Sequence, residues 1–180
     1  MPRPLRDTAP GVHHVIVGAT GYELYFARPT DRMLWLRRLV LVLERYRWRC
    51  VLMCQMTTHV HLILDVPDES LPRGMHALNS VYSRDFNADH GRRGCLLRAR
   101  YWSKPIRTEA QLLLTYRYGA RNPVRAGECQ RCEDWRYSSV ATSCGLANDY
   151  PFIDATCVLS HFGRPPEAGR ALLAYLAVGE

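Results

Sequence analysis

Residues 48–66 read WRCVLMCQMTTHVHLILDV, and this stretch decides the fold class. Two apolar runs, 48–54 and 58–66, predict two strands joined by a short turn. In the second run, His59 and His61 alternate with apolar residues. Because successive side chains of a strand point to opposite faces, both imidazoles should lie on one face of a sheet.

The flanking stretches alternate between strand and helix patterns. We expect strands at 12–18 and 101–107, helices at 31–45, 70–87 and 109–121, and short helices at 154–161 and 166–177. The third long helix should stop before Asn122-Pro123, because the residue before a proline disfavours helical geometry. The order predicts an α+β fold, a ferredoxin-like antiparallel sheet with helices packed on one face, plus a C-terminal tail. The other face would be open for a ligand.

Length and composition are those of a globular protein. The chain has 180 residues, of which 47% are hydrophobic and 23% charged, enough for one domain with a sizeable core. We see no apolar run of transmembrane length and no secretory signal, so we expect a cytoplasmic protein with no membrane partner. Seven cysteines then favour reduced thiols. One alternative is a structural zinc site at Cys129-x-x-Cys132, which would need a second pair of ligands.

The positive charge is concentrated in one quarter of the chain. Residues 91–136 hold 11 Lys+Arg against 4 Asp+Glu, a net charge of +7, and the remaining residues hold 13 of each sign. All basic residues except Lys104 are arginines, whose planar forks suit phosphate oxygens and stack on bases. The distribution favours a nucleic-acid partner over a merely soluble basic face.

A second polar motif, YGARNPVRAG, spans residues 118–127. Tyr118 and Asn122 are four residues apart, so they share a face of a helix. Two imidazoles on one strand face can reach one metal ion, and an amide oxygen from Asn122 could add a third ligand beside the Tyr118 hydroxyl. Taken separately, each motif has a plainer interpretation: strand histidines without a ligand, and a helix end at which Tyr118 only packs.

Together, MTTHVHLIL at 56–64 and Y-x-x-x-N-P-V-R-A-G at 118–127 resemble the HUH single-strand transposases with one catalytic tyrosine, and most closely the REP-associated tyrosine transposases. GVHHVIV at 11–17, RRGCLLRARYWSK at 92–104 and WRYSS at 135–139 extend this resemblance. It covers about residues 10–142. We therefore expect an N-terminal extension at 1–10, a catalytic domain at 11–142 and a C-terminal extension of unknown role at 143–180.

The resemblance implies a mechanism. His59 and His61 would bind Mg²⁺ or Mn²⁺, and Asn122 would complete the protein ligands. Tyr118 would attack a phosphate of single-stranded DNA, leaving a 5′-phosphotyrosine that stores the bond energy for strand transfer. The substrate would be hairpin-forming repeat DNA of the REP type in a prokaryotic cytoplasm, in the nucleoid, and the protein would act as a monomer or homodimer.

The sequence departs from the family in two places. Thr57-Thr58 replaces Pro-Asn before the first histidine, a change that we expect not to touch the ligands. Gly119 replaces an apolar or β-branched residue, and because glycine weakens a helix we expect a more mobile tyrosine helix. Tyr116 is the alternative nucleophile, but its spacing from Asn122 favours Tyr118.

Ten residues are candidates for DNA contact, and two of them, Tyr101 and Trp102, could stack on unpaired bases. The set is Arg92, Arg93, Arg98, Arg100, Tyr101, Trp102, Lys104, Arg107, Arg121 and Arg125. His13, His14, His76 and His90 are interpreted as polar residues without a functional role. Besides the zinc protein, one alternative function remains, a non-cleaving nucleic-acid-binding module or a domesticated, inactive transposase.

Overall fold

The structure is a computed structural model that describes residues 7–19, 24–97 and 100–178. In chain order its main elements are β1 (Gly11–Gly18), α1 (Pro29–Tyr46), β2 (Arg49–Gln55), β3 (His59–Val66), α2 (Leu71–Asp89), β4 (Trp102–Pro105) and α3 (Glu109–Arg125). The C-terminal part holds η1 (Cys132–Asp134), α4 (Val140–Ser143), α5 (Thr156–Leu159), η2 (Ser160–Phe162) and α6 (Glu167–Ala177). The elements predicted from hydrophobic periodicity are confirmed, with ends that differ by a few residues.

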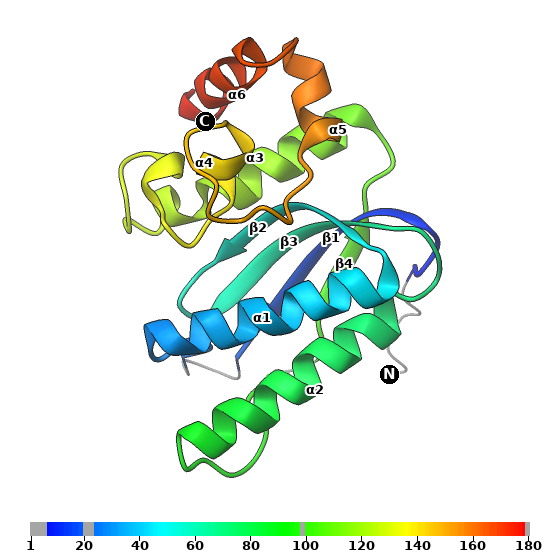
Figure 1. The fold of residues 1–180 in the computed structure, drawn as a ribbon, viewed down its shortest axis with the longest axis vertical. Coiled ribbons are helices and arrows are strands. Elements are labelled where there is room, and N and C mark those ends of the chain that lie inside the picture. The colour runs from blue at the N-terminus through cyan, green and yellow to red at the C-terminus, as the bar shows by residue number, and fades with distance from the viewer. Residues whose placement is uncertain (1–6, 20–23, 98–99, 179–180) are drawn as a thin grey trace.

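The strands form one antiparallel sheet in the order β2-β3-β1-β4 (Figure 1). Together with the βαββαβ succession, this order is ferredoxin-like, as the sequence predicts. The central pair is β3 with β1, in a register that sets Gly18 opposite His59 and Ile16 opposite His61. The two histidines therefore begin β3 in the middle of the sheet.

Helices α1 and α2 pack together on one face of the sheet (Figure 1). That face carries the alternate apolar residues of the two central strands, including Val15, Val17, Val60 and Leu62, all buried. Trp35 of α1 and Tyr82 of α2 are buried in the same cluster. The main core therefore lies on the side of the sheet that the histidines do not face.

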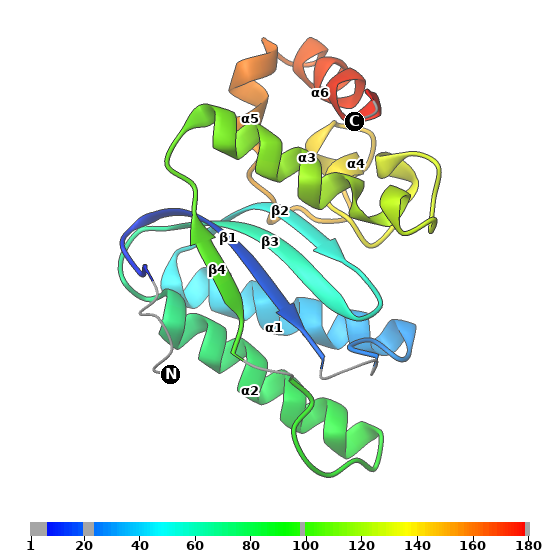
Figure 2. The same ribbon diagram turned by 180° about the vertical axis from the view of Figure 1, so that it is seen from behind.

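Helix α3 lies on the opposite face, which differs from the expectation that all helices share one face (Figure 2). The cause is that this face also carries apolar residues. Leu52 of β2 and Ile63 of β3 point to it and are fully buried with Leu112 and Tyr116 of α3. Because α3 crosses β2 and β3, this side of the sheet is partly covered.

The expected end of α3 before Asn122 is wrong, because the helix continues through Pro123 to Arg125. A proline removes only one backbone N–H, and only one further turn of chain follows it here. The backbone N–H of Ala126 still donates to the carbonyl of Asn122 (3.0 Å). Asn122 is thus helical, one turn after Tyr118. Helix α3 begins at Glu109, as predicted, and Thr108 caps it, since its Oγ1 accepts from the backbone N–H of Gln111.

The C-terminal segment packs against the outer side of α3 (Figures 1 and 2). Val158, Leu172 and Leu176 are buried in the same cluster as Tyr116. The proposed boundary at 142/143 falls inside α4 and stays a prediction. Among the described residues, no helix is both long and apolar enough to cross a membrane.

Candidate active site

His59 and His61 lie on one face of β3, as strand alternation predicts, and their rings converge. The two Nε2 atoms are 3.0 Å apart. Two ligands that bind an octahedral ion at about 2.1 Å and at right angles are themselves about 3 Å apart. The spacing of the imidazoles therefore fits two neighbouring ligands of one divalent cation.

Asn122 brings a third donor from α3 to this pair. Its side-chain amide interacts with both imidazoles and raises the pKa of His59 and of His61, against the larger lowering caused by burial. Its Nδ2 donates to the carbonyl of Tyr118 (3.1 Å), so that Oδ1 is the atom left for the imidazole side. Among the described residues, no group of three or more His, Cys, Asp or Glu side chains is placed to hold a metal. A cation here, or zinc at Cys129 and Cys132, would need a ligand of another kind, and at the histidine pair the Asn122 amide is the candidate.

Burial keeps the imidazoles neutral. Desolvation, followed by the neighbouring His59 and His14, lowers the pKa of His61 to about 3. Desolvation also lowers the pKa of His14 to about 4 and that of His59 in the same direction. Near neutral pH the rings of His59 and His61 therefore each keep a lone pair that a cation can use without first displacing a proton.

Tyr118 lies beside the histidines and is open to solvent. Its side chain is 44% exposed, and its ring meets that of His61 edge-on with centroids 5.5 Å apart. The Arg125 guanidinium lies 5.1 Å from the centroid of the Tyr118 ring. Tyr116, the alternative nucleophile, is fully buried, and burial raises the pKa of its phenol. Of the two tyrosines, only Tyr118 can meet a phosphate without rearrangement.

Gly119 allows α3 to approach the sheet closely. A β-carbon built at this position would lie 2.6 Å from Cδ2 of Leu52 and 3.7 Å from Cβ of His61. Glycine was expected to loosen the tyrosine helix. In the structure it removes the side chain that would hold α3 away from β2, and so keeps Tyr118 and Asn122 near the histidines.

Two residues that the sequence did not point to contact the imidazoles. Nε2 of His14 is 3.1 Å from Nδ1 of His61, and Oγ1 of Thr58 is 3.0 Å from Nδ1 of His59. The expectation that the Thr57-Thr58 change does not touch the proposed ligands is wrong for Thr58, which contacts His59. His14, interpreted as a polar strand residue without a functional role, contacts His61. The contact of His14 with His61 follows from the register between β1 and β3, which the periodicity of the sequence does not reveal.

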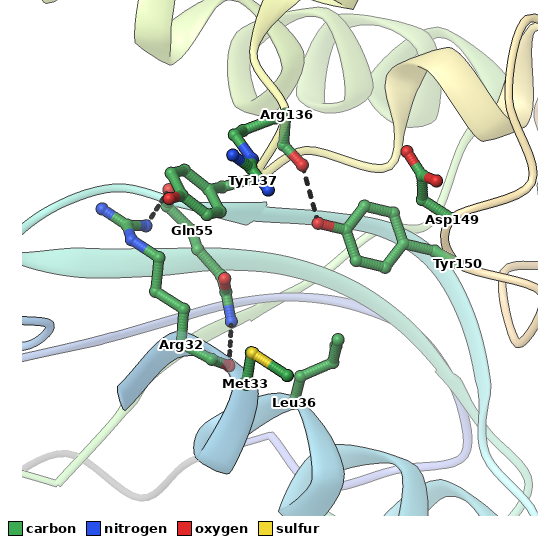
Figure 3. A pocket seen from close by; sticks show the side chains of 8 residues that line it. All are labelled: Arg32, Met33, Leu36, Gln55, Arg136, Tyr137, Asp149 and Tyr150. Carbon is green, nitrogen blue, oxygen red and sulfur yellow. Dashed lines mark hydrogen bonds between the residues drawn. The ribbon is translucent and has the colours of Figure 1, made fainter. Parts of the chain in front are cut away.

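The end of β2, just before the turn that leads to His59, is held by Arg32 on one side, as Figure 3 shows, and by Trp135 on the other. Arg32 of α1 is only 8% exposed, donates from Nη1 to the carbonyl of Gln55 (2.9 Å) and lies 4.1 Å from the centroid of the Tyr137 ring. Trp135 Nε1 donates to the same carbonyl (3.0 Å). The WRYSS motif thus fixes the end of β2, next to a cavity of about 280 Å³ lined by Arg32, Gln55, Arg136, Tyr137, Asp149 and Tyr150 among others.

The candidate DNA-contact residues divide into two groups. Trp102 is 49% exposed and meets His14 edge-on at 5.3 Å between centroids, while Lys104 is exposed on the same strand. Trp102 and Lys104 thus neighbour His14, and Arg125 lies over the Tyr118 ring. In contrast, Tyr101 is buried, against the stacking expected of it, and Arg121 donates from Nη1 to the carbonyl of Leu176 in α6 (2.5 Å), away from the site.

The remaining arginines are placed elsewhere or not described. Arg107 forms an ion pair with Asp7, and Arg92 lies over the Phe86 ring at the end of α2. Arg93 and Arg100 are exposed in the segment between α2 and β4. Arg98 lies outside the described residues.

Comparisons with known proteins bear on this geometry. No family model matches the chain. A Haemophilus influenzae protein named as a REP-associated tyrosine transposase is 26% identical over 107 residues, which are 53% of this chain and 61% of the relative. This chain resembles the REP-associated tyrosine transposases. It spans about three-fifths of the length of that curated relative.

The likeness extends to the fold. A solved structure described as a REP-associated tyrosine transposase bound to a REP hairpin matches with a TM-score of 0.67 and 17% identity. The match covers 86% of this chain and 93% of the solved one. The four-stranded antiparallel sheet with helices is therefore the fold of a REP-associated transposase.

Proposed function

We propose that this protein cuts single-stranded DNA and rejoins it through a covalent bond to Tyr118, with a divalent cation held by His59, His61 and Asn122. The observation that supports this most strongly is the convergence of a strand and a helix. The imidazoles come from β3, whereas the amide and the phenol come from α3 some 60 residues later. Packing alone does not require an imidazole pair, an amide and an exposed phenol at one point.

The chemistry follows from these groups. Mg²⁺ or Mn²⁺, when bound, would polarise the scissile phosphate and offset the charge that builds on its oxygens. The Tyr118 oxygen would form a bond to phosphorus as the bond from phosphorus to the 3′ oxygen breaks. The phenol gives up its proton, and the departing 3′ oxygen gains one to become a hydroxyl. The products are a 5′-phosphotyrosine and a free 3′ end, which can later reverse the step.

The substrate we propose is folded single-stranded DNA, hairpin-forming repeats in the nucleoid of a prokaryotic cytoplasm. The related solved structure is described as bound to a REP hairpin. In this chain, Trp102 offers an exposed ring for an unpaired base, Arg125 offers positive charge beside Tyr118, and Lys104 offers positive charge opposite His14. The protein would act as a monomer or a homodimer, and gel filtration of the DNA complex distinguishes the two.

The test is covalent capture of a labelled hairpin. The protein is mixed with 5′- or 3′-labelled single-stranded hairpin DNA and Mn²⁺ or Mg²⁺ and run on a denaturing gel. A shifted band is expected with the 3′ label and a shortened free fragment with the 5′ label, and both should disappear with a chelator. Tyr118→Phe should bind the hairpin but form no adduct, whereas Tyr116→Phe, which removes a buried hydroxyl two residues away, should retain the adduct. Equal adduct yield in Tyr118→Phe would reject the assignment, and hairpin binding without any adduct in the unmodified protein would favour a non-cleaving module.

A further inference from the structure

We infer that His14 is a positioning residue that sets the tautomer and ring angle of His61, and this inference rests on the proposed cation site. The observation that supports this inference is the hydrogen bond between Nε2 of His14 and Nδ1 of His61, 3.1 Å long. The His61 ring thus meets His59 at its Nε2 and His14 at its Nδ1.

The strand register explains why these rings meet. Ile16 of β1 is paired with His61 of β3, and His14 lies two residues before Ile16 on the same face. Diagonal neighbours across an antiparallel pair are within reach of long or aromatic side chains. The rings of His14 and His61 stack with centroids 5.4 Å apart and 17° between their planes.

Proton placement gives this contact a function. An imidazole that binds a cation through Nε2 must carry its proton on Nδ1, and metal-binding histidines almost always donate that N–H to a neighbouring acceptor. In this arrangement the Nδ1–H of His61 donates to the lone pair on Nε2 of His14, which carries its own proton on Nδ1. Without an acceptor there, His61 would be free to move its proton to Nε2 and block the ligand atom.

His14 is itself held rigidly. It is buried, and its ring meets Trp102 edge-on at 5.3 Å and Tyr118 edge-on at 6.1 Å. Its Nε2 lies on the side of His61 away from the His59 contact, so His14 supports a ligand and is not placed to be one. On the other imidazole, Oγ1 of Thr58 meets Nδ1 of His59 in the same way.

Two variants separate the hydrogen bond from the packing. His14→Phe keeps a ring between Trp102 and Tyr118 but has no acceptor, whereas His14→Gln keeps an oxygen that can accept from His61. The matched control is His76→Gln, which changes an exposed histidine on α2. Thermal unfolding of each variant verifies that it is folded.

The first readout is the affinity for Mn²⁺, measured from the free-ion electron paramagnetic resonance signal during titration. We expect His14→Phe to weaken binding by about 10–100-fold, the usual cost of losing such a partner. His14→Gln should recover most of the affinity, and His76→Gln should match the unmodified protein. Equal affinities in all four proteins would overturn the inference.

The second readout needs no metal. Long-range ¹H–¹⁵N spectra of the metal-free protein report which nitrogen of His61 carries the proton. We expect Nδ1–H in the unmodified protein and in His14→Gln, and a mixture or Nε2–H in His14→Phe. Absence of Mn²⁺ binding in the unmodified protein, together with Nδ1–H, would reject the cation site but retain the His14 contact. An Nε2–H tautomer in the unmodified protein would reject the role of His14.

Discussion

Gly119 sets how closely the tyrosine helix approaches the sheet. An alanine there has two opposing effects. It would gain about 1 kcal/mol of helix propensity, but its β-carbon would meet Cδ2 of Leu52 at 2.6 Å. The terminal methyl of a leucine can move, so the helix and the side chain would share the displacement. The effect should therefore appear in the position of Tyr118 more than in the stability of the fold.

We predict that Gly119→Ala slows adduct formation at least several-fold while changing the midpoint of thermal unfolding little. Adduct yield against time on the hairpin substrate measures the first effect, and calorimetry measures the second. The double variant Gly119→Ala/Leu52→Val removes the colliding methyl and should regain much of the rate. A single variant as fast as the unmodified protein would show that the close approach is not needed.

At the scale of elements, the WRYSS segment acts as a partner for the edge of β2. The backbone N–H of Gln55 donates to the Tyr137 carbonyl, and the backbone N–H of Ser139 donates to the Met53 carbonyl. The Ser139 side chain adds a third bond, because its Oγ accepts from the backbone N–H of Met53 (3.0 Å). These bonds cover the outer edge of β2, which would otherwise expose unpaired backbone N–H and C=O groups.

Ser139→Ala should destabilise the protein by about 1–3 kcal/mol, because the Met53 N–H loses the hydroxyl acceptor in a fully buried position. Urea denaturation followed by circular dichroism gives the free energy of unfolding. Ser160→Ala, at an exposed serine in η2, is the matched control and should change that free energy by less than about 0.5 kcal/mol. A loss at Ser139 no larger than the control would contradict the covered-edge interpretation.

The elements also show what could be predicted from the sequence. Strand alternation in 58–66 placed His59 and His61 on one face, and helical spacing paired Tyr118 with Asn122, because both patterns are local. The placement of α3 on the second face, and the meeting of His14 with His61, depend on which strands pair and in what register. Those are long-range properties, so His14 and Arg32 were not recognised as parts of the site, whereas Thr58 contacts the residue next to it in sequence.

At the scale of the whole molecule, the C-terminal segment supports the helix that carries the tyrosine. Arg117 donates to the carbonyl of Val178, and Arg121 to that of Leu176, at the C-terminal end of α6. Cations at that end of a helix also interact favourably with its dipole. The buried face of α6 shares the second core with Leu112 and Tyr116 of α3.

Because the two cores meet through β2 and β3, we predict one cooperative unfolding transition that includes the C-terminal segment. Leu172→Ala, at a fully buried position, should lower the free energy of unfolding by about 2–5 kcal/mol. Leu114→Ala, at an exposed position on α3, is the control and should cost far less. Two separate transitions, or a Leu172 variant as stable as the control, would show instead that residues 143–180 fold independently.

The central claim is that the Tyr118 oxygen becomes bonded to DNA at a cation held by the two imidazoles. The most direct measurement is mass spectrometry of the proteolysed adduct formed with a single-stranded hairpin and Mn²⁺. We predict a nucleotide joined through its 5′-phosphate to the peptide that contains Tyr118, and no such peptide from a His59→Ala/His61→Ala variant that still folds. Attachment at a different residue, or at Tyr118 with equal yield in the variant without the histidines, would contradict the account.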